Sequence, residues 1–373
     1  MSGQVFQAYA SAAFGLEGLV SAELRRLGMQ DVKAGSGGVR FSTGLEGLFL
    51  CDLRLRFCDR VFILMAEGRC LSFDELFRLV NGLPWEKYMT GTEAVNISCR
   101  CARSRLMSQR DCQSIAKKAV LERLKAHTGR TIFPENGPAF PIHISVHSDT
   151  VMVLLNVSGP SLSRRGYRTW NGEAPLRETL ASALVELSPW RPGMPLYDPC
   201  CGTGTILIEA AFREAHRAPG LSRSFALEDF SFADRELFDS VRRVESSQAD
   251  FSRITSIGGS DLDPSAIELA SRHIRQAGLD GHISLSVLPL QDLELDGENG
   301  VFICNPPYGE RLGTLDESRA LCRDLRALSD RHPTWSFCAV SSDPAFERCF
   351  GRRADRKRRL YNGTIECVFY VFE

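Results

Sequence analysis

The second half of the chain alternates short apolar runs with helical patterns, and this alternation constrains the fold more than any other feature. The strand-like runs are residues 195–197, 256–260, 283–287, 301–304, 336–341 and 366–372. The helical patterns between them cover about 205–216, 264–277, 317–330 and 343–349. Repeated strand–helix units are typical of a doubly wound, mostly parallel sheet. The sequence therefore predicts an α/β domain over this half.

A glycine-containing loop follows the first of these strands. It reads Asp198-Pro199-Cys200-Cys201-Gly202-Thr203-Gly204-Thr205, and a helical pattern begins at once. Glycines here let the backbone approach a ligand that lies over the strand end. The loop lacks a third glycine at Leu207, as a dinucleotide loop would require, and no Gly-Lys-Ser/Thr follows, as in a P-loop. This favours a nucleoside-sized cofactor without phosphates.

Acidic residues follow the second and third strands. Asp261 lies where a carboxylate would bind the hydroxyls of a ribose. Asp263 precedes Pro264 and is expected to cap the next helix instead. Gln291 and Asp292 follow the third strand, where an adenine amino group could be recognised. A surface acid or a simple turn is the ordinary alternative for each residue, but their order at successive strand ends favours one cofactor site.

The fourth strand, Val301–Cys304, ends in Asn305-Pro306-Pro307-Tyr308. Two prolines must stop the strand, because they lack an N–H group and fix φ. An Asn-Pro pair alone usually marks only a turn. Here the amide and proline oxygens could accept hydrogen bonds from an amino group, and the tyrosine ring offers a flat face for stacking. At the fourth strand end, the motif predicts a clamp for a substrate amino group.

The first 160 residues contain two modules: an α+β module at about 4–65, without an obvious catalytic group, and a second module at about 73–157. The second module has an excess of basic residues: Arg100, Arg103, Arg105, Arg110, Lys117, Lys118, Arg123, Lys125 and Arg130. Such a cluster is usually a solvated face. This one begins in a loop before a helix N-terminus, where phosphate is also favoured. Contact with a nucleic-acid backbone and a plain surface role both remain open.

Composition sets outer limits on function. The formal net charge is −1, so any case for nucleic acid rests on local clusters. The 13 cysteines are scattered, and neither Cys99-Arg100-Cys101 nor Cys200-Cys201 has the spacing of a zinc site, so we expect buried thiols and no metal. There is no long apolar run and no signal peptide, so we expect a cytoplasmic protein without a membrane partner.

Several motifs together resemble a known family. They are residues 198–205, 260–264, 305–313 and 357–363 (Lys-Arg-Arg-Leu-Tyr-Asn-Gly), with weaker likeness at 108–115, 164–168 and 174–178. The set resembles class I S-adenosylmethionine-dependent methyltransferases that act on amino nitrogens. It is most similar to the THUMP-domain RNA methyltransferases, in particular the bacterial 23S rRNA guanine-N2 methyltransferase family. Cys200 stands where relatives often carry a bulkier residue such as methionine, which should be harmless.

The resemblance implies a domain order. It places a ferredoxin-like segment at 1–70, a THUMP RNA-binding domain at 71–158, a linker and helix at 159–190, and a methyltransferase domain at 191–373. The last would be a Rossmann-like sheet, mostly parallel with an antiparallel last strand. The implied cofactor is S-adenosylmethionine and the implied partner is structured RNA, while the oligomeric state stays open.

The resemblance also assigns site residues. The catalytic residues would be Asn305, Pro306, Pro307 and Tyr308. The cofactor would contact Asp198, Pro199, Cys200, Gly202, Thr203, Gly204, Thr205, Asp261, Leu262, Gln291, Asp292 and Asn305. RNA would contact Arg103, Arg105, Arg110, Lys117, Lys118, Arg165, Arg168, Lys357, Arg358 and Arg359, although a solvated basic hairpin is the alternative for the last three.

Three other functions remain open. A tRNA guanine-N2 methyltransferase would share the same arrangement. A DNA adenine-N6 methyltransferase shares Asn-Pro-Pro-Tyr, but the basic N-terminal module argues against it. A non-catalytic RNA-binding or ribosome assembly factor could keep the fold, although it would have no reason to keep Asn305 and the loop glycines.

Overall fold

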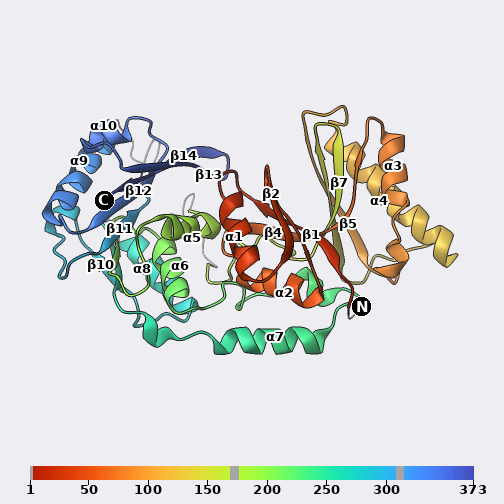
Figure 1. Ribbon diagram of the computed structural model, residues 1–373, viewed down its shortest axis with the longest axis horizontal. Helices are drawn as coiled ribbons and strands as arrows, with labels where there is room; N and C mark the ends of the chain where they lie inside the picture. The colour runs from red at the N-terminus through yellow and green to blue at the C-terminus, as the bar shows by residue number, and fades with distance from the viewer. Residues whose placement is uncertain (1–2, 169–175, 308–314) are drawn as a thin grey trace. The chain divides into compact units, whose positions relative to one another are not determined.

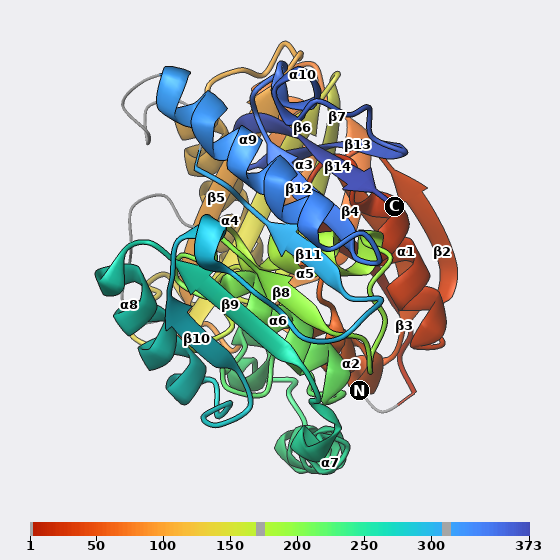
Figure 2. The same cartoon turned by 90° about the vertical axis from the view of Figure 1, so that its left-hand side faces the viewer.

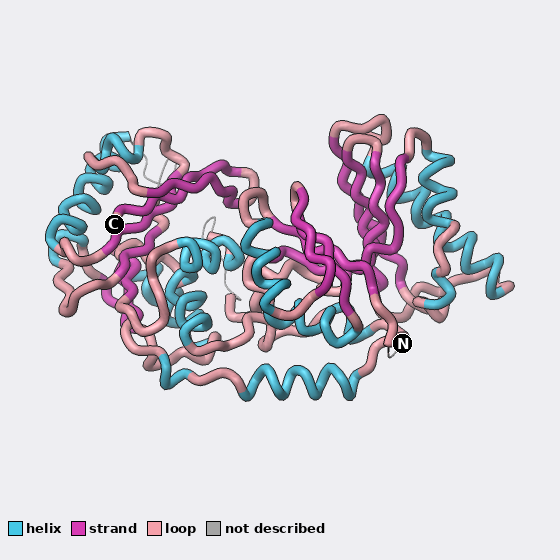
Figure 3. Tube along the Cα trace, in the orientation of Figure 1, coloured by secondary structure: helices cyan, strands magenta, loops and turns pink. Residues whose placement is uncertain are grey.

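The computed structural model describes residues 3–168, 176–307 and 315–373, which form two compact units. Unit 1 comprises Met1–Ala12, Val20–Leu162 and Arg223–Arg243, and unit 2 comprises Ala13–Leu19, Ser163–Ser222 and Val244–Glu373. Each unit is built on a seven-stranded sheet, and Figure 3 shows the strands of both. The α/β class predicted from the sequence is confirmed.

The sheet of unit 1 has the order β2-β3-β1-β4-β7-β6-β5. Its strands are β1 (Phe6–Ala12), β2 (Gln30–Gly35), β3 (Gly38–Thr43), β4 (Cys58–Arg69), β5 (Ala94–Ala102), β6 (Ala139–His147) and β7 (Thr150–Asn156). All neighbours pair antiparallel except β5 and β6, which are parallel. β6 and β7 form an antiparallel hairpin.

Helices cover this sheet. They are α2 (Leu45–Arg54), α3 (Phe73–Asn81) and α4 (Gln109–Thr128), with the short 3-10 turns η1 (Trp85–Lys87) and η2 (Ala226–Asp229). Serine side chains cap two of them: Ser72 accepts from the N–H of Glu75, and Ser108 from that of Asp111. Gly129, with φ of +70°, ends α4 in the left-handed conformation that glycine favours. α1 (Glu17–Arg26) and α7 (Arg235–Ser247) each have residues in both units.

Residues 223–243 lie in the sequence between two segments of unit 2 but belong to unit 1. The Phe49 ring on α2 stacks on Phe238 with centroids 4.3 Å apart and meets Phe225 edge-on at 5.7 Å. The Arg242 guanidinium lies 5.3 Å from the centre of the same Phe49 ring. Residues 223–243 therefore complete the core of unit 1, although their place in the sequence is inside the predicted methyltransferase segment 191–373.

The sheet of unit 2 has the order β10-β9-β8-β11-β12-β14-β13. Its strands are β8 (Leu196–Asp198), β9 (Ile257–Asp261), β10 (Ser284–Val287), β11 (Val301–Cys304), β12 (Ser336–Ser341), β13 (Arg356–Asn362) and β14 (Ile365–Phe372). The first five in spatial order are parallel, and β14 pairs antiparallel with both β12 and β13. The mostly parallel sheet with an antiparallel last strand is as expected.

Helices lie on both faces of this sheet. The helices are α5 (Glu178–Leu187), α6 (Thr205–Glu214), α8 (Pro264–Gln276), α9 (Leu315–Arg331) and α10 (Phe346–Phe350), with the 3-10 turns η3 (Phe251–Arg253) and η4 (Leu290–Asp292). Figures 1 and 2 show α6 and α8 on one face and α9 and α10 on the other. Phe302 and Phe337, fully buried on adjacent strands, pack with Leu325 of α9 in the core of the second face. Among the described residues, no helix is both long enough and apolar enough to cross a membrane.

A carboxyl group is buried in unit 1. Asp52 of α2 is 1% exposed and accepts a hydrogen bond from the hydroxyl of Ser158, which in turn accepts one from the N–H of Val61. Burial raises the pKa of Asp52 to about 8, although the Ser158 bond and the charge of Arg223 oppose this. The native state therefore holds this proton more tightly than the unfolded chain, whose carboxyl has an ordinary pKa of 3.8.

We predict that Asp52→Asn removes part of the pH dependence of stability. Because the native pKa is raised, the stabilising contribution is complete below about pH 4 and is lost as the pH rises to about 8. The free energy of unfolding of the neutral variant should rise relative to that of the wild type as the pH rises, by about 4 kcal/mol between pH 5 and pH 8. Urea unfolding at pH 5 and pH 8 measures this. The exposed Asp239→Asn on α7 is the matched control, and parallel pH profiles for Asp52→Asn and wild type would contradict the prediction.

Candidate active site

The loop after β8 is fixed by hydrogen bonds from three sides. The N–H of Gly202 donates to Oδ2 of Asp261 over 2.9 Å, and the N–H of Cys201 donates to the carbonyl of Ser260 over 2.9 Å. On the helix side, Nδ1 of the buried His273 lies 3.2 Å from the carbonyl oxygen of Thr203. The ends of β8 and β9 and the helix α8 thus hold one loop, and the position of its backbone is set before any ligand binds.

Two glycines explain how closely these strand ends approach. A Cβ atom at Gly259 would lie 2.8 Å from Leu207 and 2.9 Å from both Cys201 and the carbonyl of Asp198, so no larger residue fits there. Gly202 is the opposite case: its φ is +51°, and a Cβ atom would meet nothing within 4 Å. The backbone is therefore tightly packed at Gly259, whereas the side of the loop that a Cβ atom at Gly202 would occupy is open. This open side leaves room for a ligand.

Two carboxyl groups lie below this open side. Asp198 is 1% exposed and accepts from the N–H of Cys200 over 3.1 Å. Burial raises the pKa of Asp198 well above its usual range, against the Cys200 hydrogen bond, and the nearby Asp261 raises it further. In the described part of the chain no ion pair is found for either acid. A positively charged ligand at this place would favour the ionised carboxylates.

Asp261 is already engaged by the backbone. Its Oδ2 accepts from Gly202, and its Oδ1 accepts from the N–H of Asp263 over 3.1 Å. A carboxylate can accept about four hydrogen bonds, so these contacts orient it and leave room for hydroxyl donors. Asp263 caps α8 as predicted, because its side chain accepts from the N–H of Ser265 and Pro264 begins the helix.

The other predicted cofactor residues lie around the same strand ends. Leu262 follows Asp261 and is 66% exposed, so a large apolar side chain faces solvent where a flat base could cover it. Gln291 and Asp292 form η4 after β10, and both are exposed. The Gln291 amide donates a hydrogen bond to Oδ2 of Asp324 on α9 over 2.9 Å, so its NH₂ group already has a partner within unit 2.

The chain turns at Asn305 directly after β11. Oδ1 of Asn305 is buried and has no hydrogen-bond partner among the residues that the structure describes. Such an acceptor costs free energy unless a ligand donates to it, about 1–3 kcal/mol. Pro306 and Pro307 line a small cavity with Leu321 and Phe346, so apolar packing holds the turn in place. The fourth member of the predicted clamp, Tyr308, lies outside the described residues.

The linker arginines are inside unit 2, which corrects their assignment to RNA. The Arg165 side chain is 2% exposed, and its Nε lies 3.4 Å from Oε1 of Glu209 on α6. Glu209 also accepts from the hydroxyls of Tyr167 and Ser182. Arg168 is 9% exposed, donates to the hydroxyl of Thr205 and lies 3.5 Å from Glu178. Both arginines fasten the linker to the helix that follows the cofactor loop.

His273 and Glu209 were missed by the sequence analysis. Both lie on helices, in patterns that fit an ordinary buried face. His273 supports the loop at Thr203, and Glu209 accepts the hydrogen bonds of the linker. Nothing in the local sequence marks either residue for its role.

The remaining basic residues are exposed, but several are paired. In unit 1, Arg103 and Arg105 lie in the loop between β5 and α4, Arg110 lies in the first turn of α4, and Lys118 follows. Lys117 is paired with Glu135 over 2.8 Å. In unit 2, three of the four basic residues of β13 are predicted RNA contacts, and each has a partner. Lys357 pairs with Glu347, Arg358 donates to the carbonyl of Gly15, and Arg359 pairs with Glu366.

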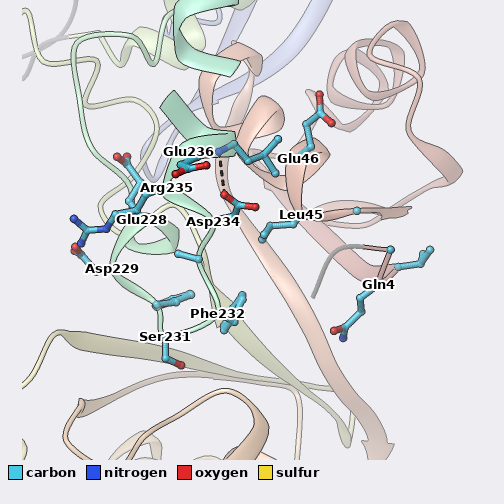
Figure 4. A pocket seen from close by; sticks show the side chains of 16 residues that line it. Gln4, Leu45, Glu46, Glu228, Asp229, Ser231, Phe232, Asp234, Arg235 and Glu236 are labelled. Atoms are coloured by element: carbon cyan, nitrogen blue, oxygen red, sulfur yellow. Dashed lines mark hydrogen bonds between the residues drawn. The ribbon is translucent and has the colours of Figure 1, made fainter. Parts of the chain in front are cut away.

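A separate hollow of about 860 Å³ lies in unit 1. Its lining includes five acids, Glu46, Glu228, Asp229, Asp234 and Glu236, and one basic residue, Arg235, and Figure 4 shows these side chains. It contains none of the strand-end residues, and its charge would repel phosphate. We therefore assign the chemistry to the strand ends of unit 2.

The arrangement in unit 2 can hold a cationic nucleoside over an open glycine loop and offer an unused amide oxygen to a donor beside it. This sheet order with its strand-end groups defines a class I methyltransferase, the class whose cofactor is S-adenosylmethionine. The residues fit that cofactor, since Gly202 is open above and two carboxyl groups lie nearby.

Comparison with known proteins gives the family. The family described as "RMKL-like, methyltransferase domain" matches residues 165–370, the "RlmL ferredoxin-like domain" matches 7–62, and the THUMP domain matches 70–156. The chain is 34% identical to "Putative RNA methyltransferase YpsC" of Bacillus subtilis, covering 97% of this chain and 94% of that one. The chain belongs to the RMKL-like methyltransferase family.

Two further relatives define the extent of the likeness. The chain is 33% identical to "Ribosomal RNA large subunit methyltransferase K/L" of Syntrophotalea carbinolica, of which it spans only 53%. A solved structure, "SMU.472, a putative methyltransferase complexed with SAH", is 38% identical with a TM-score of 0.94, covering 99% of this chain and 98% of that one.

Proposed function

We propose that the protein is an RNA methyltransferase that transfers a methyl group from S-adenosylmethionine to the exocyclic N2 of a guanosine in 23S rRNA. The buried Oδ1 of Asn305, without a partner in the described residues, carries the chemical part of this proposal. The THUMP match and relatives named as RNA methyltransferases support RNA as the substrate. Guanine and 23S rRNA follow from the family resemblance.

The chain's residues would prepare the amino group for transfer. An exocyclic amino group is a poor nucleophile, because its lone pair is delocalised into the ring. The two N–H groups of this amino group would donate hydrogen bonds to Asn305 Oδ1 and to the Pro306 carbonyl. These bonds favour a pyramidal nitrogen and stabilise the positive charge that develops on it in the transition state. When bound, S-adenosylmethionine supplies an electrophilic methyl group on a sulfonium. The amino proton becomes acidic once nitrogen is alkylated, so it can pass to solvent.

Other strand-end residues would bind the cofactor. Gly202 and Gly204 would lie against its methionine part, with Asp198 supplying negative charge. Asp261 would accept from the ribose hydroxyls with the lone pairs that the backbone leaves free. Beside the base, the exposed Leu262 would cover its face and Asp292 would accept from the adenine amino group.

RNA contact is proposed for the exposed basic loop of unit 1. Arg103, Arg105 and Arg110 precede or begin α4, whose N-terminal N–H groups add favourable potential for phosphate. Oδ1 of Asp149 accepts from the Ser104 hydroxyl over 2.9 Å and from the Arg105 N–H over 2.8 Å, so the loop backbone is held and the guanidinium groups stay outside. The basic strand β13 of unit 2 is a second candidate surface.

A tRNA guanine-N2 methyltransferase remains the alternative, since none of the strand-end residues distinguishes one RNA from another. We predict that a strain lacking the protein loses N2-methylguanosine from 23S rRNA, measured by mass spectrometry of nucleosides from separated rRNA and tRNA pools. A loss confined to tRNA would support the alternative, and unchanged levels in both pools would contradict methylation of guanine N2. Restoration by the wild-type gene is the control.

We predict that Asn305→Ala lowers the rate of methyl transfer about 10²–10³-fold, as expected when one preorganised transition-state contact is removed. Single-turnover transfer from labelled cofactor to transcript RNA measures this, and calorimetry with S-adenosylhomocysteine checks that cofactor binding persists. Asn299→Gly is the control, because Asn299 lies in an exposed turn with φ of +59° that glycine accepts. A native rate in Asn305→Ala would rule out the clamp.

We predict that the double variant Arg103→Ala, Arg105→Ala binds RNA more weakly and with a shallower salt dependence. Each lost phosphate contact should reduce the slope of log K against log salt by about 0.7–0.9. Fluorescence anisotropy between low and moderate salt measures both quantities. Lys33→Ala on β2, an exposed basic residue outside the proposed contacts, is the control. An unchanged slope in the double variant would show that the loop does not contact phosphate.

A further inference from the structure

Three thiol groups meet at the junction of β5 and α4 in unit 1. Cys99 and Cys101 are two residues apart on β5, so their side chains share one face of the strand. Cys112, in the first turns of α4, faces them from the helix. Their Sγ atoms all lie within 4.8 Å of one another, and those of Cys99 and Cys101 are 3.5 Å apart.

This spacing suits the coordination of one cation. Three thiolates around a tetrahedral zinc ion, with Zn–S bonds of about 2.3 Å, have sulfur atoms about 3.8 Å apart. The Cys99–Cys101 separation is 3.5 Å and no separation exceeds 4.8 Å, so shifts of no more than about 1 Å would bring all three sulfurs to a shared centre. We propose that Cys99, Cys101 and Cys112 form a binding site for a zinc ion.

The surroundings fit the charge and the coordination number of such a site. A zinc ion with three thiolates carries one net negative charge, and the N-terminal end of α4, next to Arg110, favours negative charge. Cys99 and Cys112 are buried, whereas Cys101 is half-buried. Water can therefore reach the fourth coordination position from the Cys101 side.

Binding requires no redox partner. The three S–H bonds break, three protons pass to solvent, and three S–Zn bonds form. Burial raises the pKa of Cys99 and brings that of Cys112 to about 11, so both are neutral thiols at pH 7 in the absence of a cation. The zinc ion supplies the free energy that deprotonates them.

The site would have a structural consequence for the basic loop. Its ligands Cys101 and Cys112 lie on either side of that loop in the sequence, so a bound ion would close it covalently at the base. A cross-link of this kind lowers the entropy of the open states of the loop. The loop carries Arg103, at φ of +51°, and Arg105, so the ion would help to keep both in one arrangement.

The alternatives are three neutral thiols packed as small apolar groups, and a disulfide between two of them. A disulfide would use two sulfurs and leave the third, whereas a cation uses all three. Two residues spaced i, i+2 on one strand also have Cα atoms about 6.5 Å apart, near the limit for bridging. The mutual approach of three sulfurs therefore favours the cation.

Cobalt titration of the full-length protein tests this. Protein stripped with a chelator in a phosphine reductant should take up one Co²⁺ per chain with sulfur-to-cobalt charge-transfer absorption in the near ultraviolet, and Zn²⁺ should abolish the band. Cys101→Ser should weaken Co²⁺ binding at least about 30-fold. The half-buried Cys349→Ser of α10 is the matched control and should leave the titration unchanged.

Two measurements guard against misfolded variants. Circular dichroism must show a native fold for Cys101→Ser, and saturating Zn²⁺ should raise the Tm of the wild type but not of that variant. In the wild type alone, Zn²⁺ should protect Cys101 from alkylation while Cys349 still reacts, as read by mass spectrometry. Absence of the charge-transfer band, its persistence at unchanged Co²⁺ affinity in Cys101→Ser, or a disulfide among the three cysteines of freshly prepared protein that has not been reduced would each overturn the proposal.

Discussion

The hydrogen bond from the Gly202 N–H to the Asp261 carboxylate joins the ends of two neighbouring parallel strands, and the candidate site depends on it. It fixes the open glycine loop relative to the acid that follows β9. The absence of side chains at Gly202 and Gly259 makes the approach possible, one by allowing a left-handed φ and the other by removing a clash with Leu207. The position of the glycine loop relative to the Asp261 carboxylate is therefore a consequence of the close packing of these two strand ends.

The sequence predicts which polar groups follow which strand of unit 2, because each of these strands ends in a different motif. Apolar runs stopped by Pro199 or Pro306 mark the strand ends, and the structure confirms their parallel order. β13 was not predicted as a strand, because four consecutive basic residues, Arg356–Arg359, hide its alternation. Its pairing with β14 is decided by tertiary contacts.

The structure corrects the sequence analysis where a side chain's partner lies far along the chain. Arg165 looks like an RNA contact in a basic linker, but Glu209, 44 residues later, makes it a buried ion pair. The proposed zinc site is also assembled from separate elements: Cys99-Arg100-Cys101 lacks a zinc-site spacing, and the fold brings Cys112 within 4.8 Å of both thiols. Motif spacing reports local geometry only, so sites assembled from separate elements escape it.

The return of residues 223–243 to unit 1 has a consequence for how such proteins diversify. The aromatic rings of Phe225 and Phe238 that pack on Phe49 are encoded inside the stretch that otherwise makes the catalytic unit. A single crossover between genes would separate these rings from their partner and leave an apolar surface on α2. Exchange of unit 1 for another such unit therefore demands coordinated change at two distant points of the gene.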